Sequence, residues 1–465
     1  MRKYGIFSAI LAIFLTTNTF AAESDNLIFS TCEGNYSGLC ALTSNKQMTT
    51  WRYTDNIVNL PDDIHEFLYI ESACTEGACL GVGGYITPKD KEGIDKIKAF
   101  IFRDNQDGSQ FQYQEIIPPN TNEALLRNIT CANNECIAIG SKWMLNFKEQ
   151  PLILRSTGDM SSWQEINPIP GIDDKISIEV MRSACTNDYC VIAGSLYNLK
   201  TDAYSPIFLV SHHGKINWSI AAITHKTAFN KRLAFKKSAC SGNACAAVGS
   251  TYDTTTQSFY PLIYVSRDAG NSWTEQKVNE AGVILTDVTC DKGSCIAVGY
   301  YNLPITGMHN KEIILVNHGD DQWQIKNLVS APNTHRYVES VNCSGQFCLL
   351  GGVLSTNTGT TQPVKQYTNL LYISHDHGDS WQPIDVGLHT DPAHFPTVYF
   401  SCTASNCLLA TTDMIKDPKH PHAPARVLPV VAMSDRTGEH WTRHITKNIP
   451  DNITNMRPQS VYHGQ

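Results

Sequence analysis

The segment from Thr289 to Trp323 decides the fold, because it contains a complete copy of a unit that recurs along the chain. It opens TCDKGSCIAVGYY (residues 289–301), in which two cysteines flank four residues with turn chemistry and an apolar run follows. A second apolar run, residues 312–316, leads into the polar loop NHGDDQW, which ends at Trp323. Recurrence of one unit at a regular spacing indicates a repeat architecture, so the unit has to be explained before anything else.

All 16 cysteines of the 465-residue chain fall into pairs that mark successive units. The pairs with four intervening residues are Cys74 and Cys79, Cys131 and Cys136, Cys185 and Cys190, Cys240 and Cys245, Cys290 and Cys295, Cys343 and Cys348, and Cys402 and Cys407; the looser pair is Cys32 and Cys40. A period of roughly fifty to sixty residues is the size of one four-stranded propeller blade. The sequence therefore predicts an all-β fold, a β-propeller of eight four-stranded blades. Seven blades is the alternative, because the first repeat, at about residues 25–60, is too short for four strands.

The residues between paired cysteines are rich in Gly, Asn, Asp and Ser, which favour tight hairpins. Two cysteines that flank such a hairpin face each other across antiparallel strands, within disulfide reach. Closing so small a loop stabilises by only about 2 kcal/mol, so each bridge would mainly fix strand register. A zinc site is the rival interpretation, but zinc favours other spacings and no repeat has a fixed histidine partner. We expect one disulfide inside each hairpin, and no metal or other cofactor.

The N-terminal residues 1–22 have the pattern of a secretory signal peptide. Arg2 and Lys3 supply the positive start, residues 6–15 the apolar core, and small residues the cleavage site. The apolar run is too short to span a bilayer, and an even, regularly spaced cysteine set suits an oxidising compartment. We expect a secreted or periplasmic protein in which residues 25–465 form a single propeller domain, with no integral membrane segment after signal cleavage.

Composition and motifs argue against several functional classes. The formal net charge is -8, from 36 basic and 44 acidic residues that are interspersed along the chain. Such a balance gives no electrostatic footprint for nucleic acid. The chain also lacks G-x-S-x-G, H-E-x-x-H and phosphate-loop motifs, so no catalytic residue is assigned from local patterns.

Two loops, VSRDAGNSW and ISHDHGDSW, match the pattern S-x-D-x-G-x-x-W. The residues concerned are Ser266, Asp268, Gly270 and Trp273 in one, and Ser374, Asp376, Gly378 and Trp381 in the other. With these loops and several degraded copies, the chain resembles the Asp-box, or bacterial neuraminidase repeat, sialidase-like β-propellers. The resemblance implies structural hairpins between third and fourth strands, with the tryptophan packed between blades and the ligand site on the opposite face.

The resemblance also implies that a functional site lies at the mouth of the central channel. The candidate ligand residues, each three positions before the first cysteine of a pair, are Glu71, Arg182, Lys237, Asp287 and Tyr399. The same offset in successive repeats converges on one ring. This ring is interpreted either as a polar ligand platform or as channel walls and buried ion pairs. The position before it adds Arg127, Lys236 and Glu339.

Long loops offer a different location for a site. The loops 86–97, 356–367 and 415–425 are candidates, since loops on a rigid scaffold commonly carry function. His420 and His422 could ligate a metal, but exposed histidines in an irregular loop are more often incidental.

The most consistent function is an exported propeller that binds a glycan or another protein and is not an enzyme. The rival is a glycoside hydrolase or lyase with catalytic carboxylates at the channel mouth. The Arg-Ile-Pro segment expected of sialidases is missing from this sequence. A glycosidase would need two carboxyl groups about 5–10 Å apart, which a sequence cannot place.

Overall fold

A computed structural model describes residues 26–463 in part. The ranges outside the description are 34–37, 45–50, 56, 62–63, 65, 76–77, 89–95, 105–109, 146–148, 167–175, 199, 202, 214–216, 225–232, 303–310, 321, 329–333, 359–363, 387–397, 404–405, 416–425, 436, 446–448 and 450–454. The predicted signal peptide, residues 1–22, lies outside the described residues. Within the described part, no helix has the length and apolar character needed to cross a bilayer.

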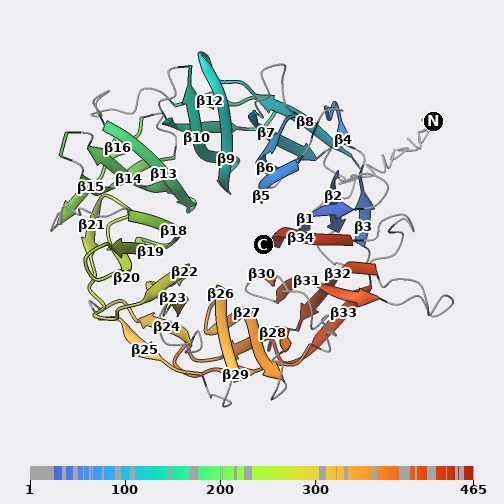
Figure 1. The fold of residues 1–465 in the computed structure, drawn as a ribbon, viewed down its shortest axis with the longest axis vertical. Helices are drawn as coiled ribbons and strands as arrows, with labels where there is room; N and C mark the ends of the chain where they lie inside the picture. Colours follow the sequence, from blue (N-terminus) through green and yellow to red (C-terminus); the bar gives the residue numbers. More distant parts are fainter. Residues whose placement is uncertain are drawn as a thin grey trace, which may run out of the picture.

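The described strands are arranged as groups of four around a central axis (Figure 1). Each group is called a strand set here, numbered from the N-terminus. Set 1 contains β34 (Asn455–His463), β1 (Asn26–Glu33), β2 (Gly38–Ser44) and β3 (Trp51–Thr54), and set 2 contains β5 (Glu66–Thr75), β6 (Ala78–Ile86), β7 (Ile97–Asp104) and β8 (Phe111–Ile116). Set 3 contains β9 (Thr121–Ala132), β10 (Glu135–Met144), β11 (Glu149–Thr157) and β12 (Gln164–Glu165). Set 4 contains β13 (Ile176–Cys185), β14 (Tyr189–Asn198), β15 (Ala203–His212) and β16 (Ser219–Ile220).

The remaining strands continue the ring in the same order. Set 5 contains β18 (Leu233–Ser241), β19 (Ala244–Asp253), β20 (Ser258–Ser266) and β21 (Ser272–Glu275), and set 6 contains β22 (Val283–Asp291), β23 (Ser294–Tyr301), β24 (Glu312–Asn317) and β25 (Gln324–Lys326). Set 7 contains β26 (Thr334–Ser344), β27 (Phe347–Thr358), β28 (Val364–Ser374) and β29 (Gln382–Pro383). Set 8 contains β30 (Tyr399–Cys402), β31 (Cys407–Ile415), β32 (Arg426–Ser434) and β33 (Trp441–Ile445). Short strands β4 (Ile57–Val58) and β17 (Ala222–Thr224) pair in parallel with β8 and β21.

The described strands form seven hydrogen-bonded sheets, so the alternative count of seven blades is confirmed when each sheet is counted as one blade. Sets 2 to 7 each form one sheet, whereas sets 1 and 8 share an eight-stranded sheet. The two sets are linked there by a single parallel pairing, between Val427 of β32 and Asn455 of β34. Eight apolar clusters of described residues fill the contacts between neighbouring sets, so the core is distributed around the ring.

The first repeat is completed by the other end of the chain. Strand β34 pairs antiparallel with β1 and takes the innermost position, so the order from the axis is β34, β1, β2 and β3. Strand β1 is therefore the second strand of its set, although the position of its cysteine in the repeat would make it an inner strand. The ring closes through this pairing of chain ends, as Figure 1 shows.

Seven hairpin disulfides confirm the interpretation of the cysteine pairs with four intervening residues. The bridges join Cys74 to Cys79, Cys131 to Cys136, Cys185 to Cys190, Cys240 to Cys245, Cys290 to Cys295, Cys343 to Cys348, and Cys402 to Cys407. Each first cysteine is registered directly opposite its partner, as expected for a hairpin staple. The Cα–Cα distances are 4.0–4.1 Å.

The looser eighth pair is described only in part. Cys40 is disulfide-bonded, while the side chain of Cys32 lies outside the description, so the predicted bridge between them stays a prediction. Disulfides in this number are typical of an oxidising environment.

The inner strands of sets 2 to 7 are each interrupted by a bulge that the sequence analysis did not anticipate. In β18, for example, Phe235 and Lys237 pair with adjacent residues of β19, so Lys236 is the extra residue. A bulge brings the strand backbone close to its neighbour. A Cβ added to Gly249 would lie 1.9 Å from the carbonyl oxygen of Ala234, which explains the glycine four residues after the second cysteine.

Candidate functional site

Four of the five predicted ring residues lie inside their strands rather than at the strand ends. Lys237 is the fifth of the nine residues in β18, and Asp287 is the fifth of the nine in β22. Glu71 and Arg182 occupy similar central positions in β5 and β13. At about 3.3 Å per residue, Lys237 and Asp287 are about 13 Å from either end of their strands. A ligand at this level has to enter along the axis.

Glu71 and Lys237 meet across the axis. The Lys237 Nζ lies 3.6 Å from Glu71 Oε1, although the two residues belong to sets 5 and 2. Their side chains keep 40% and 29% of their surface accessible, so solvent reaches this level even though protein surrounds it. The Glu71 carboxylate raises the pKa of Lys237 against the opposing effect of burial, and Asp287 adds to the rise. Arg182 acts in the opposite direction. Groups from four strand sets are therefore within electrostatic reach of one ammonium group.

Asp287 has a second contact that ties neighbouring sets together. Its Oδ2 accepts a hydrogen bond from the Val341 backbone N–H at 3.0 Å, and its Oδ1 accepts one from Val288 at 2.9 Å. At the same offset in set 3, Asn128 Oδ1 accepts a 2.8 Å bond from the Ser183 N–H. Burial raises the pKa of Asp287, and Lys237 and these donors oppose the rise. Asp287 therefore faces the axis and also anchors the next inner strand.

The remaining members of the predicted ring differ in their surroundings. Arg182 donates from Nε to the backbone carbonyl of Lys236, one set further along. Tyr399 begins β30, and its side chain is half-buried. Burial, followed by the charges of Glu339 and Glu71, raises the pKa of Tyr399 to about 12. The five predicted residues thus lie around one axis, but only Glu71 and Lys237 form an ion pair among them.

Glu339 is the axial residue whose importance the sequence analysis missed. The register shift in β26 lies between Val338 and Ser340, so Glu339 is the bulged residue and has no partner in β27. Bulges commonly re-aim a side chain near functional sites. Burial raises the pKa of Glu339 to about 7. The glycine pair at 351–352, opposite the bulge, was the available sequence signal.

The two S-x-D-x-G-x-x-W loops adopt the same hydrogen-bonded turn. In the first, Asp268 Oδ1 accepts bonds from Ser266 Oγ at 2.9 Å and Ser272 N–H at 2.8 Å. The Trp273 indole donates to the Gly270 carbonyl at 3.0 Å. In the second, Asp376 Oδ1 accepts from Ser374 Oγ at 2.8 Å and from the Ser380 N–H at 2.8 Å, and Trp381 donates to Gly378 at 2.9 Å. The loops therefore satisfy their own polar groups and leave little for a ligand.

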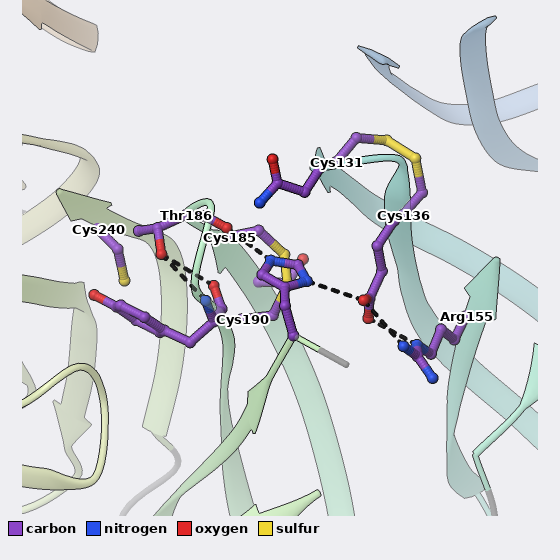
Figure 2. Close-up of a disulfide and its surroundings, with 12 residues drawn as sticks. Cys131, Cys136, Arg155, Cys185, Thr186, Cys190 and Cys240 are labelled. Carbon is purple, nitrogen blue, oxygen red and sulfur yellow. Dashed lines mark hydrogen bonds and ion pairs between the residues drawn. A yellow bond between two sulfur atoms is a disulfide. The ribbon is translucent and has the colours of Figure 1, made fainter. Parts of the chain in front are cut away.

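A further polar network joins sets 3 and 4 beside two of the disulfides (Figure 2). Glu135 Oε1 lies 2.7 Å from Arg155 Nε, and Glu135 Oε2 lies 2.9 Å from His213 Nδ1. The other nitrogen of His213 contacts the Thr186 carbonyl at 2.8 Å. Burial raises the pKa of Glu135, but bonds from Arg155 and His213 outweigh burial and hold it below its ordinary value. Since the neighbouring groups are paired to one another, this network serves the contact between sets.

The alternative loop and histidine candidates lie largely beyond the described residues. Most of the loops 86–97 and 415–425 and part of 356–367 fall outside the description, as do His420 and His422. Among the described residues, no group of three or more His, Cys, Asp or Glu side chains is arranged to hold a metal ion.

Comparison with solved structures finds other propellers at low similarity. The match with the β-propeller domain of the Trilobed protease from Pyrococcus furiosus covers 83% of this chain and 100% of that one, at 12% identity and a TM-score of 0.44. A Trypanosoma rangeli sialidase mutant with trans-sialidase activity matches at 10% identity and a TM-score of 0.38, over 81% of this chain and 70% of that one. A Hadza microbial sialidase matches at 11% identity and a TM-score of 0.40, over 73% and 74%.

These similarities concern architecture alone, and scores at this level carry no functional argument. No protein-family model matches the sequence, and no curated protein matches it. These neighbours include both sialidase and protease propellers, so the Asp-box resemblance rests on the two loops themselves.

Proposed function

We propose that this protein is an exported binding module that takes a glycan or protein ligand at its axis. The supporting observation is the convergence of Glu71 and Lys237 across the ring, with accessible side chains, in the electrostatic field of Arg182 and Asp287. Concave sites with a few convergent polar groups are where propellers and other rigid scaffolds place their ligands. Tyr399 adds an aromatic surface of the kind that stacks on sugar rings.

The cellular part of the proposal rests on the cysteines and the N-terminus. Residues 1–22 act as a signal peptide, and residues 25–465 form one disulfide-stapled domain that is secreted or periplasmic. Seven hairpin disulfides among the described residues support an oxidising destination. N-terminal sequencing of the exported protein checks the cleavage site.

The test of axial binding is a glycan array followed by titration of the hits against charge-reversed variants. Lys237→Glu and Arg182→Glu should each weaken binding at least tenfold and leave the melting temperature nearly unchanged. Trp273→Ala should do the reverse, because Trp273 is buried between sets. The proposal fails if both reversals leave affinity untouched while changes in the 356–367 or 415–425 loops abolish it.

A glycoside hydrolase or lyase is the rival function, with the axial carboxyls as catalysts. Glu339 favours it, because a carboxyl whose pKa is about 7 holds a proton near neutral pH, as a general acid must. The same purified protein is incubated with a panel of chromogenic glycosides. Turnover that Glu339→Gln removes would replace the binding proposal with the enzymatic one.

A further inference from the structure

The two sides of the axis differ in how their charges are satisfied. On the side of sets 2 to 5, Glu71 is paired with Lys237 and Arg182 is bonded to a backbone carbonyl. On the side of sets 6 to 8, the half-buried groups include Asp287, Glu339 and the tyrosines at 300, 337 and 399. Among the acids of this second side, Asp287 has the Lys237 ammonium within electrostatic reach, whereas Glu339 has no ion-pair partner among the described residues.

The tyrosines form an aromatic wall around Glu339. Tyr300 in β23 and Tyr337 in β26 pack edge to face, with ring centroids 5.7 Å apart and an interplanar angle of 66°. Glu339 follows Tyr337 by two residues on the same strand, and Tyr399 begins the next inner strand, β30. Burial raises the pKa of both Tyr300 and Tyr399, and the charge of Glu339 raises each further, so both phenols are within electrostatic range of this carboxyl.

Glu339 is left without a donor, unlike the other axial carboxyls. Asp287 accepts two backbone N–H bonds, and Glu71 faces an ammonium group. Within the described part of the chain, no ion pair or hydrogen bond reaches Glu339, and burial alone accounts for the shift of its pKa. A half-buried carboxylate without a partner costs free energy that a cation placed beside it would recover.

We propose that Glu339, Tyr300, Tyr337 and Tyr399 form a site for a slender aliphatic ammonium group. Aromatic faces attract ammonium ions through their quadrupole, and the carboxylate supplies the opposite charge. The group has to be slender, because Glu339 is the sixth of the eleven residues in β26, so a ligand reaches it only along the axis. Glu71 and Lys237 also meet across the axis at the neighbouring level. These four residues are called the tyrosine–glutamate site below. The inference rests on the proposed axial binding function and names the ligand chemistry of one side.

The ammonium group could be carried by a linear amine or by an amino sugar, which share this chemistry. The probes are therefore 1,4-diaminobutane, glucosamine and, as an uncharged control, 1,4-butanediol. Isothermal titration calorimetry at pH 8, where Glu339 is ionised, measures each on the full exported chain. Binding of the diamine alone indicates a linear amine, and binding of glucosamine indicates a sugar-borne amine; neither the parent nor its variants should bind butanediol.

Variants separate the site from general electrostatic attraction. Glu339→Gln keeps the shape of the side chain and should weaken amine binding at least tenfold. Tyr399→Phe keeps the ring and should stay within threefold of the parent, whereas Tyr399→Ala should weaken binding further. Glu439→Gln is the matched control, because this side chain is 63% exposed and lies on the surface; it should change nothing.

The pH dependence adds an independent readout. Amine affinity should fall below pH 7, towards tenfold per pH unit, as Glu339 becomes protonated. The titratable groups facing Glu339 are Tyr337 on its own strand, Tyr300 from β23 and Tyr399 from β30, with Glu71 beyond Tyr399. The pKa values of Tyr300 and Tyr399 are raised, so the decline in affinity should follow Glu339 and should be absent in Glu339→Gln.

Two results would overturn the inference. One is the absence of any heat with both amines at millimolar concentration; the other is equal amine binding by the parent and Glu339→Gln. Either result is compatible with the proposed function if the glycan array still identifies a ligand whose binding Lys237→Glu weakens. Loss of amine binding in Glu339→Gln together with an empty array would instead uphold the cation site and remove the glycan proposal.

Discussion

Asp268 in its hairpin loop and Glu339 at the axis are both carboxyl side chains, but they have opposite surroundings. Asp268 Oδ2 accepts a 2.6 Å bond from Ser272 Oγ, besides the two bonds to Oδ1. Although burial acts in the other direction, these donors hold its pKa below the ordinary value. Burial raises the pKa of Glu339 to about 7, with no donor among the described residues. The loop carboxylate completes a local structure, whereas the axial one is available to something outside the chain.

The largest expected loss of stability follows from replacing Trp273 in the first hairpin loop. Its side chain is 1% exposed and stacks on Phe208 of set 4, with ring centroids 4.1 Å apart and planes at 8°. Trp273→Ala should lower the free energy of unfolding by about 3–5 kcal/mol, because it leaves a cavity between sets. Urea titration followed by fluorescence or circular dichroism measures it. Trp381→Ala is the matched variant in the second loop, and a cost below about 1 kcal/mol at both positions would contradict the packing argument.

A smaller effect is expected when the loop carboxylate itself is removed. Asp268→Ala leaves the Ser272 N–H and the Ser266 hydroxyl without their acceptor. Because the loop is exposed, water replaces part of these bonds, and we expect a loss of about 1–2 kcal/mol. Asp379→Ala is the control: its carboxylate is 43% exposed and pairs with Lys326 on the surface, so it should cost less than about 1 kcal/mol. Equal losses of unfolding free energy in Asp268→Ala and Asp379→Ala would show that the loop carboxylate stabilises the fold no more than a surface carboxylate does.

The pH dependence of stability should distinguish the axial carboxyl. Glu339 has a folded-state pKa of about 7 against an ordinary value of 4.5. Between these values the unfolded chain has lost the proton that the folded chain keeps, so the Glu339 contribution to stability falls as pH rises from about 4.5 to 7. Glu339→Gln should therefore be stabilised relative to the parent at pH 7 and equal to it below pH 4.5. Thermal unfolding of both proteins across this range is the measurement, and parallel curves would show that Glu339 is not perturbed.

The smallest effect on stability is expected at the ion pair that crosses the axis. Lys237→Gln removes the 3.6 Å contact with Glu71, but the two side chains keep 40% and 29% of their surface accessible to solvent. Accessible ion pairs are worth about 0–1 kcal/mol, so the melting temperature should hardly change, whereas ligand affinity should fall. A large loss of stability would mean that the pair supports the ring rather than serving a ligand.

Several features could be predicted from the sequence because they are made within a few residues. The C-x4-C hairpins need only turn-forming residues and opposed strands, and the structure shows seven of them closed by disulfides. The loop at Ser266–Trp273 is equally local: its polar groups bond to one another within seven positions. Repetition of such units at a fixed period was sufficient to predict a propeller.

Other features were decided only by the closed ring. Strand β34 replaces the expected inner strand of set 1, because chain ends that are over 400 residues apart become neighbours on closure. Glu71 and Lys237 are 166 positions apart, and nothing local to either residue encodes their contact across the axis. Glu339 depends on a bulge, where the strand adds a residue that has no partner in β27. Sequence thus determined the repeated unit through short-range hydrogen bonding and hydrophobic pattern. Tertiary structure alone decided which side chains meet at the centre, because that depends on how all the units pack together.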